Sequence, residues 1–162
     1  MKKLINLHTL AQTAEKLRFQ GKKIVATSGC FDILHAGHVT YLAEAKECAD
    51  ILVVMLNSDK SVRRLKGDER PIIPQDERAT VLCALESVNF VCIFDDDTPC
   101  LAYSAFKPDV VVKGGDYKET QIPELRTVAE YGGAVEFVSL VDGCSSMNII
   151  EKIKKLAMYK ND

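Results

Sequence analysis

The sequence predicts an α/β protein built on one doubly wound parallel sheet. Five short apolar runs alternate with helical patterns along the 162 residues, and strands that alternate with helices form parallel sheets covered on both faces. A hydrophobic content of 47% supplies enough apolar side chains for the core of one domain. We therefore expect a Rossmann-like five-stranded sheet in the order 3-2-1-4-5. A single domain would span residues 1–162, with an N-terminal helix in 1–22 and the core in 23–157.

Each predicted element has its own local signal. The apolar runs that predict strands lie at residues 23–28, 50–57, 88–94, 108–113 and 134–139. Helical patterns lie at about 9–20, 36–49, 75–87, 98–106, 122–131 and 145–157, and a less regular segment lies near 58–66. Thr98 followed by Pro99 is typical of an N-cap and a first helical residue, and Gly21 and Gly132 are typical helix ends.

The predicted strand order places the binding site between the first and fourth strands. Ligands of doubly wound sheets bind beyond the carboxyl ends of the strands, at the point where the strand order reverses. The segments that leave those two strands are GCFDILHAGH (29–38) and KGGDY (113–117), so we expect them to face each other. The long loop candidate KGDERPIIP (66–74) would be a binding element or a lid.

The overall composition excludes several classes of partner. The formal net charge is −2, and 21 basic and 23 acidic side chains are well mixed, so no basic stripe predicts binding to nucleic acid or to a membrane surface. No apolar run reaches the length of a membrane span, and the N-terminus lacks a signal-peptide pattern. The six cysteines form no C-x-x-C pair. We expect a cytoplasmic protein.

Two of the three histidines lie on either side of Gly37, at the junction between a predicted strand and a predicted helix. His35 and His38, three residues apart, lie on one side of the first helical turn, where free N–H groups and the helix dipole favour an anion. Gly37 would let a phosphate or a base approach the backbone. Core histidines, or a metal site of Cys30, His35 and His38, are the alternatives. The sequence has no G-x-G-x-x-G and no P-loop, which argues against hydride transfer and P-loop chemistry.

Three further groups of polar residues are candidates for the same crevice. Lys113 and Asp116 frame two glycines after the fourth predicted strand. Ser145 and Ser146 open the last predicted helix, where a serine is either an N-cap or a ligand for a terminal phosphate. The basic side chains around the long loop form either a solvated face or a site for an anionic second substrate; they are Arg63, Arg64, Lys66, Arg70 and Arg78.

Taken together, these motifs resemble those of the heptose 1-phosphate adenylyltransferases, members of the H-x-G-H nucleotidyltransferase superfamily. The similarity runs from about Ile24 to Lys155, through GCFDILHAGHVTYLAEAK, LNSDKSVRRLKGDERPI, DDTP, PDVVVKGGDY and DGCSSMNIIEKI in that order. The combination of RLKGDERPI and VKGGDY indicates the heptose enzymes within the superfamily. This chain departs from the family pattern at Ser28, where asparagine is usual, and at Ser146 and Met147, where two threonines are usual.

The resemblance implies transfer of AMP from ATP, with Mg²⁺, to D-glycero-β-D-manno-heptose 1-phosphate, giving ADP-heptose and pyrophosphate. His35 and His38 would be catalytic, and no protein residue would be a metal ligand. The implied nucleotide-binding residues are Gly29, Cys30, Phe31, Gly37, Gly114, Asp116, Ser145 and Ser146. The implied residues for the sugar phosphate are Asp32, Lys66, Arg70 and Lys113.

The resemblance also implies partners, and other readings remain open beside it. The family's domain is often fused to a sugar kinase, for which this chain has no room, so a separate heptose kinase is the expected pathway partner. The sequence leaves the oligomeric state open, with a homodimer as one alternative. Alternatives are a cytidylyltransferase acting on glycerol 3-phosphate or a related alcohol phosphate, a flavin adenylyltransferase, and a non-catalytic nucleotide sensor.

Overall fold

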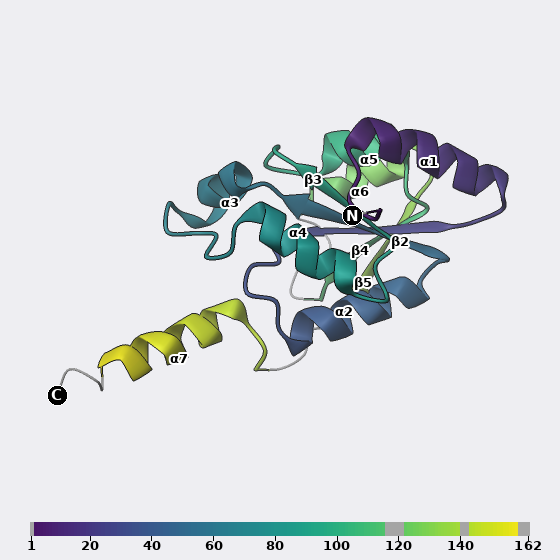
Figure 1. Ribbon diagram of the computed structural model, residues 1–162. Helices are drawn as coiled ribbons and strands as arrows, with labels where there is room; N and C mark the ends of the chain where they lie inside the picture. Colours follow the sequence, from purple (N-terminus) through teal and green to yellow (C-terminus); the bar gives the residue numbers. More distant parts are fainter. Residues whose placement is uncertain (1, 116–121, 140–142, 159–162) are drawn as a thin grey trace.

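The computed structural model describes residues 2–115, 122–139 and 143–158 (Figure 1). Its strands are β1 (Ile24–Gly29), β2 (Ile51–Asn57), β3 (Phe90–Phe94), β4 (Val110–Gly114) and β5 (Ala134–Val138). Its helices are α1 (Leu7–Phe19), α2 (Ala36–Glu47), α3 (Asp59–Lys66), α4 (Gln75–Ala84), α5 (Cys100–Phe106), α6 (Glu124–Glu130) and α7 (Ser146–Met158). None of the helices in these ranges combines the length and the apolar character that a membrane span requires.

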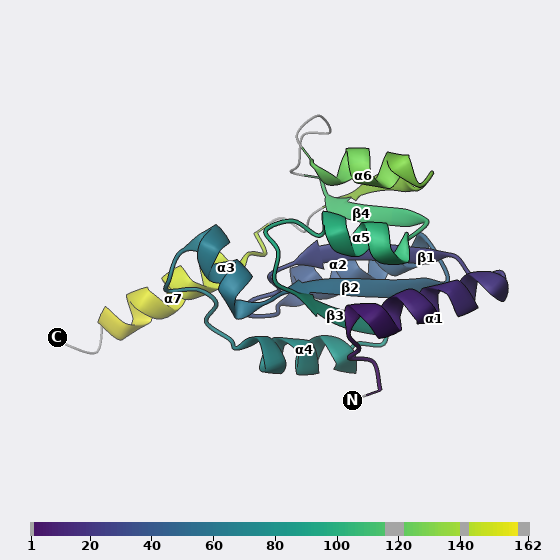
Figure 2. The same ribbon diagram turned by 90° about the horizontal axis from the view of Figure 1, so that it is seen from above.

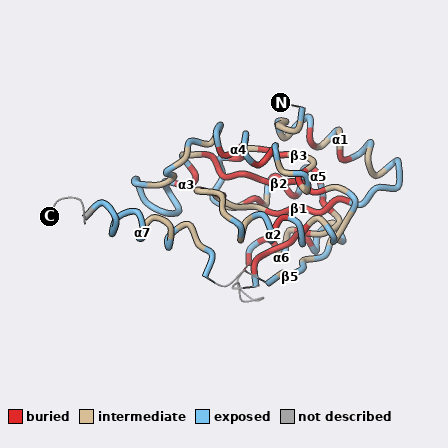
Figure 3. Tube along the Cα trace, turned by 60° about the horizontal axis from the view of Figure 1, so that its bottom comes forward, coloured by how far each residue is buried: buried red, intermediate tan, exposed pale blue. Residues whose placement is uncertain are grey.

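The five strands form one parallel sheet in the order β3-β2-β1-β4-β5, which confirms the predicted topology. Two layers of helices cover it, as Figures 1 and 2 show. Side chains of α2 and α4 form one core cluster with the sheet, and side chains of α1, α5 and α6 form the other. The central strands β1 and β2 are almost wholly buried (Figure 3), as expected of parallel strands with helices on both faces.

Two local predictions need correction. The segment near 58–66 is the regular helix α3, in which the Ser58 hydroxyl accepts from the Ser61 N–H at 3.0 Å, and basic residues fill the last turn. Its two apolar residues, Val62 and Leu65, lie three apart on one face, and the capping and charge pattern also favours the helix. Helix α5 begins at Cys100 with Pro99 at the N-cap, one residue later than predicted.

A buried arginine of α4 connects three segments at the carboxyl edge of the sheet. The Arg78 side chain is 1% exposed, and its Nη1 donates to the carbonyl oxygens of Cys30 at 2.5 Å and Asn57 at 3.0 Å. Its Nε donates to the Ile73 carbonyl at 2.9 Å, and its Nη2 pairs with Asp59 at 2.7 Å. One guanidinium therefore satisfies carbonyls at the ends of β1 and β2 and in the loop before α4.

Replacing this arginine is expected to destabilise the fold strongly. Arg78→Met keeps an apolar stem of similar length but leaves three carbonyls and the Asp59 carboxylate without their donor. We expect a loss of about 3 kcal/mol in the free energy of unfolding, measured by urea denaturation. Arg126→Met, which removes a mostly exposed ion pair with Glu130, is the control and should cost less than about 0.5 kcal/mol. Equal losses in the two variants would contradict this role.

Candidate active site

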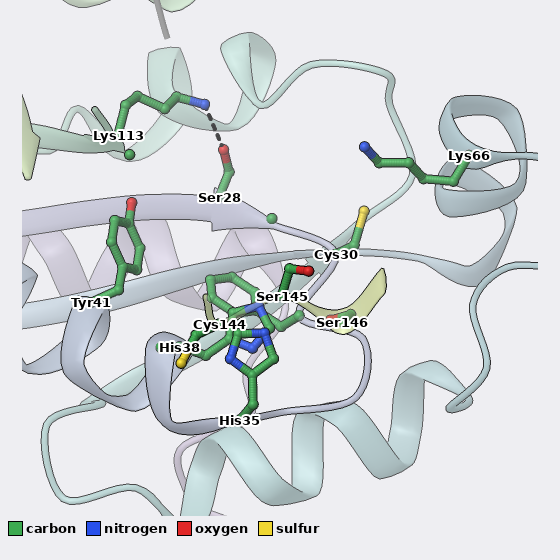
Figure 4. A pocket seen from close by; sticks show the side chains of 14 residues that line it. Ser28, Cys30, His35, His38, Tyr41, Lys66, Lys113, Cys144, Ser145 and Ser146 are labelled. Carbon is green, nitrogen blue, oxygen red and sulfur yellow. Dashed lines mark hydrogen bonds between the residues drawn. The ribbon is translucent and has the colours of Figure 1, made fainter. Parts of the chain in front are cut away.

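Two adjoining pockets open at the carboxyl ends of β1 and β4, where the topology predicts a binding crevice. The first, here called the histidine pocket, has a volume of about 400 Å³ and contains both histidines of the HAGH motif (Figure 4). The second has about 390 Å³ and lies toward α3 and the start of α6. The two pockets share a wall made of Ser28, Gly29, Cys30, Lys66 and Lys113.

The two histidines lie against each other at the start of α2. His35 is the N-cap residue, with extended backbone and no side-chain cap hydrogen bond, and His38 lies in the first turn. Their ring centroids are 3.9 Å apart and the rings are stacked at 28° (Figure 4). The Phe31 ring lies 5.4 Å from His38, between centroids, and limits the rotation of that imidazole. Two imidazoles thus stand together where the uncapped N-terminus of a helix favours an anion.

Both imidazoles are set up to be neutral before a ligand arrives. Burial lowers the pKa of His35, and burial together with the neighbouring His35 lowers the pKa of His38 to about 4, against a smaller opposing effect of Asp32. The Nδ1 atoms of both rings are buried without a hydrogen-bond partner among the described residues. Buried polar groups in native proteins normally have hydrogen-bond partners. Two adjacent imidazole nitrogens without one therefore indicate a site where a ligand supplies the partner.

Gly37 is required by the close approach of the segment before α7. A Cβ on Gly37 would lie 2.8 Å from the Cβ of Cys144 and 3.1 Å from ring atoms of His35. Any other residue would therefore push the last helix away from the histidines or rotate His35. The glycine permits contact between the HAGH turn and the start of α7, as well as access to the helix N-terminus.

The paired serines at the start of α7 line the histidine pocket, and both hydroxyls also make hydrogen bonds within the protein. The Ser145 hydroxyl accepts from the Asn148 N–H at 3.0 Å, which is N-cap geometry. The Ser146 hydroxyl donates to the Asp32 carbonyl and so ties α7 to the loop after β1. The cap role and the pocket-lining role therefore coexist at these serines.

A buried ion pair lies at the shared wall of the pockets. Lys113 Nζ is 2.5 Å from Glu124 Oε1 and donates to the Ser28 hydroxyl at 3.0 Å, and the Lys113 and Glu124 side chains are 8% and 5% exposed. Tyr41 braces the neighbouring strands through Thr27 at 2.6 Å and the Val112 carbonyl at 3.1 Å. Because Glu124 balances its charge, the ammonium of Lys113 can be held at the wall of a pocket without an isolated buried charge.

The Asp32 carboxylate lies beneath the pockets and holds the long loop. Its side chain is 1% exposed and accepts from the N–H groups of Ile72 at 2.8 Å and Ile73 at 2.9 Å, and from Arg70 Nε at 2.7 Å. Burial alone would raise the pKa of Asp32, but these donors outweigh burial and hold its pKa below the usual value. Arg70 and Asp32 therefore bind each other, and neither lines the two pockets.

Most of the residues expected from the sequence come together in the histidine pocket. It is lined by His35, His38, Gly29, Cys30, Phe31, Gly37, Gly114, Ser145, Ser146, Lys66 and Lys113. Asp116 lies outside the described residues. Sequence reasoning missed Glu124, which follows a proline in an ordinary helical pattern, and gave Arg78 no role of its own. The described residues contain no group of three or more His, Cys, Asp or Glu side chains that could hold a metal ion.

Curated proteins similar to this chain are much longer than it is. The chain is 53% identical over 152 residues to the "Bifunctional protein HldE" of Geotalea uraniireducens (strain Rf4), which covers 94% of this chain and 31% of that protein. It is 50% identical over 153 residues to the protein of the same name from Geobacter sulfurreducens, with the same two coverages. The chain thus spans about a third of the length of the curated relatives it matches.

A solved structure and a family model agree with the architecture. The crystal structure of a lipopolysaccharide core biosynthesis protein from Thermoplasma volcanium GSS1 superposes with a TM-score of 0.62 at 31% identity, covering 75% of this chain and 98% of that one. The cytidylyltransferase-like family model matches residues 26–152, which include most of β1, all of β2 to β5, the HAGH turn and the paired serines. The resemblance seen in the motifs is therefore confirmed, and the chain belongs to the cytidylyltransferase-like family.

Proposed function

We propose that this chain is a single nucleotidyltransferase domain that transfers AMP from ATP to D-glycero-β-D-manno-heptose 1-phosphate. The observation that carries the proposal is the pair of stacked histidines with unpartnered buried Nδ1 atoms at a helix N-terminus. A second pocket shares a wall with theirs, and in this proposal the two anionic substrates would occupy the two pockets. The order of the motifs and the similarity to the HldE proteins support the heptose acceptor.

The reaction needs positioning and charge stabilisation rather than a protein nucleophile. An oxygen of the sugar phosphate attacks the α-phosphorus of ATP, a new phosphoanhydride bond forms, and the bond from the α-phosphorus to the bridging oxygen breaks. The electron pair of that bond leaves with pyrophosphate. Holding the two phosphates in line removes most of the entropic cost, and donors aimed at the transferring group stabilise the added charge.

His35 and His38 would supply those donors to the triphosphate. A neutral imidazole donates one hydrogen bond, and the negative charge of bound ATP raises the histidine pKa values and favours a second N–H. Cys30 would contribute its backbone rather than its sulfur, because burial raises the pKa of that thiol despite nearby Lys66, Arg78 and Arg70. Ser145, Ser146 and the start of α7 would hold the phosphates that leave.

Mg²⁺ would arrive with ATP. The histidine pocket offers hydroxyls, imidazoles and ammonium groups, a donor set that fits phosphate oxygens, so the ion would be held through the phosphates and water. When bound, Mg²⁺ neutralises charge on the phosphate oxygens. The residues of this chain would orient the phosphates and add hydrogen-bond donors to the transferring group.

The sugar phosphate would occupy the second pocket. Lys66 and Lys113 stand on the wall that the two pockets share, where the acceptor phosphate must meet the α-phosphate. Glu124 lines the same pocket and holds Lys113, and a carboxylate there also suits a sugar hydroxyl. Asp32 and Arg70 would act from behind by fixing the loop that carries Ile72 and Ile73.

The cellular setting follows from the proposed reaction. The acceptor is the product of a sugar kinase reaction, and the relatives that share this domain are named bifunctional. We place the reaction in the cytoplasm, where ATP is supplied. The proposed partners are therefore two small molecules, with neither nucleic acid nor a membrane.

The choice of substrates tests the function directly. Pyrophosphate release should be at least about tenfold faster with ATP than with CTP when heptose 1-phosphate is the acceptor, the factor equivalent to 1.4 kcal/mol. Glycerol 3-phosphate should be a poor acceptor with either nucleotide. A preference for CTP with glycerol 3-phosphate would identify a cytidylyltransferase instead. Nucleotide binding without turnover on any acceptor would identify a sensor.

The histidine pair is expected to be essential for turnover. His35→Ala and His38→Ala should each lower kcat by roughly 100-fold, the scale of losing one donor to a transition-state charge. Circular dichroism and thermal unfolding should show that both variants are folded. His8→Ala, in α1 and outside both pockets, is the matched control and should leave kcat unchanged. Normal turnover in both pocket variants would remove these residues from the mechanism.

The lowered pKa of His38 predicts acid-sensitive stability of the free protein. Because its folded pKa, about 4, lies below the unfolded value of 6.5, the unfolded chain takes up the proton first. Stability is therefore full above pH 6.5 and falls as the pH drops from 6.5 toward 4. The free energy of unfolding of the wild type should therefore fall between pH 7 and pH 5. After allowance for solvent screening, this fall should be roughly 1 kcal/mol smaller in His38→Gln. Urea denaturation at both values measures it, and parallel losses in variant and wild type would contradict the assignment.

A further inference from the structure

Helix α7 leaves the body of the protein and runs outward (Figures 1 and 2). Its beginning is held by the Ser146 hydroxyl on the Asp32 carbonyl and by the close approach of Cys144 to Gly37. Residues 151–157 are all exposed, and two large apolar side chains among them, Ile153 and Leu156, are 57% and 59% exposed. A helix with two exposed large apolar residues normally packs against something.

The apolar residues of α7 lie on one face of the helix and have a basic border. At about 100° per residue, the apolar side chains form a stripe roughly 120° wide. The members of this stripe are Ile149, Ile150, Ile153, Leu156 and Ala157. The same spacing places Lys152 along one border of the stripe and Lys154 along the other. This arrangement is typical of a helix that enters an apolar groove with acidic edges.

Such a groove lies on the outer side of α2. It has a volume of about 540 Å³ and is lined by Val39, Ala43 and Leu85, together with the more polar Lys46, Glu47, Glu86 and Ser87. Val39 is 42% exposed, and Val81 of α4, a helix on the same side of the sheet, is 45% exposed. This face therefore presents apolar side chains that nothing covers within the described residues.

The charges of the two surfaces are opposite. Two of the residues that line the groove, Glu47 and Glu86, are exposed carboxylates, against the single cation Lys46. Lys46, the cation in the groove, donates to the carbonyls of Ala49 and Asp50 at the end of α2. Helix α7 carries three lysines and one glutamate over residues 151–157. Pairing α7 with the α7 of another copy would oppose like charges, whereas pairing it with the α2 groove opposes unlike charges.

We propose that α7 docks in the α2 groove of a second copy of this chain, so that two copies exchange their last helices reciprocally. The chain's own groove is out of reach, because α7 is fastened at the HAGH turn and its outer turns point away from the body (Figure 1). A reciprocal exchange buries the apolar stripe twice in one symmetric dimer.

The exchange would join the assembly to the histidine pocket. Ser145 and Ser146 line that pocket and begin the helix that the second copy would hold. The second copy would therefore fix the position of two pocket hydroxyls without entering the pocket itself. The proposed contact depends on exposed apolar and charged side chains and not on a bound substrate. Its test is therefore independent of the proposed function.

Sedimentation velocity of the full chain over a concentration series tests the contact. The wild-type chain should be a dimer. Ile153→Asp combined with Leu156→Asp should raise the dimer dissociation constant at least about 100-fold. Each aspartate would be buried against apolar side chains of the groove, and each should weaken the dimer by a factor of about ten. Both residues are exposed, so thermal unfolding of the monomer should not change. Phe19→Asp, at a residue 95% exposed on α1, is the matched control and should leave the dimer intact.

Charge reversal identifies the surface that α7 meets. Lys152→Glu with Lys154→Glu should weaken the dimer, and so should Glu47→Lys with Glu86→Lys. The chain carrying all four changes should dimerise again, because its groove is then basic and its helix acidic, so that the two charges are again opposite. A monomeric wild type, a dimer that survives Ile153→Asp with Leu156→Asp, or a fourfold variant that stays weak would each overturn the proposal.

Discussion

The arrangement of the site depends on one buried carboxylate, that of Asp32. It lies in the loop between β1 and α2, and its two oxygens accept three hydrogen bonds from the loop that precedes α4. The carbonyl of the same residue accepts from Ser146 at the start of α7. Three segments far apart in the sequence therefore meet at Asp32. A buried carboxylate is tolerated because each bond is directional and one donor is the Arg70 guanidinium.

The loop that contains Asp32, between β1 and α2, is also conformationally unusual. Phe31 and Ile33 have φ angles of 46° and 51°, a region that L-residues and above all β-branched residues rarely adopt. Backbone of this kind persists only where its surroundings determine it. Here Asp32, which lies between these two residues, binds the long loop, and Arg78 donates to the Cys30 carbonyl. The strained backbone lies in the turn that directs the two histidines into the pocket. Backbone strain of this kind is concentrated at functional sites.

The sequence was sufficient to predict the sheet and the position of the site. Alternating apolar runs determine the strands, and the strand order brings the ends of β1 and β4 together, so the HAGH turn and Lys113 must be neighbours. The roles of single polar side chains were harder to predict. Asp32, Lys113 and Glu124 are chemically suited to bind a ligand or to bind each other, and only their distances show that Asp32 holds a loop and that Lys113 pairs with Glu124.

Other features could not be predicted because they depend on tertiary contacts. Arg78 belongs by sequence to a group of basic residues that suggests a solvated face, yet its side chain is 1% exposed and spans three carbonyls. The segment of α3 was expected to be less regular, whereas its cap and terminal charges stabilise it and its Val62 is buried. A helix of eight residues with only two apolar side chains is too short for periodicity alone to identify it.

Lys113, the buried cation at the shared wall of the two pockets, is paired before any ligand binds. Both histidines are neutral because burial lowers their pKa values, and Lys113 is paired with Glu124. This arrangement avoids the cost of unpaired buried charge in the free protein. A triphosphate would then bring its own negative charge, which favours protonation of the imidazoles and draws Lys113 toward a second acceptor. Positive charge on the imidazoles would thus develop when the triphosphate binds, and donors aimed at the transferring phosphate stabilise the charge that builds up during the transfer.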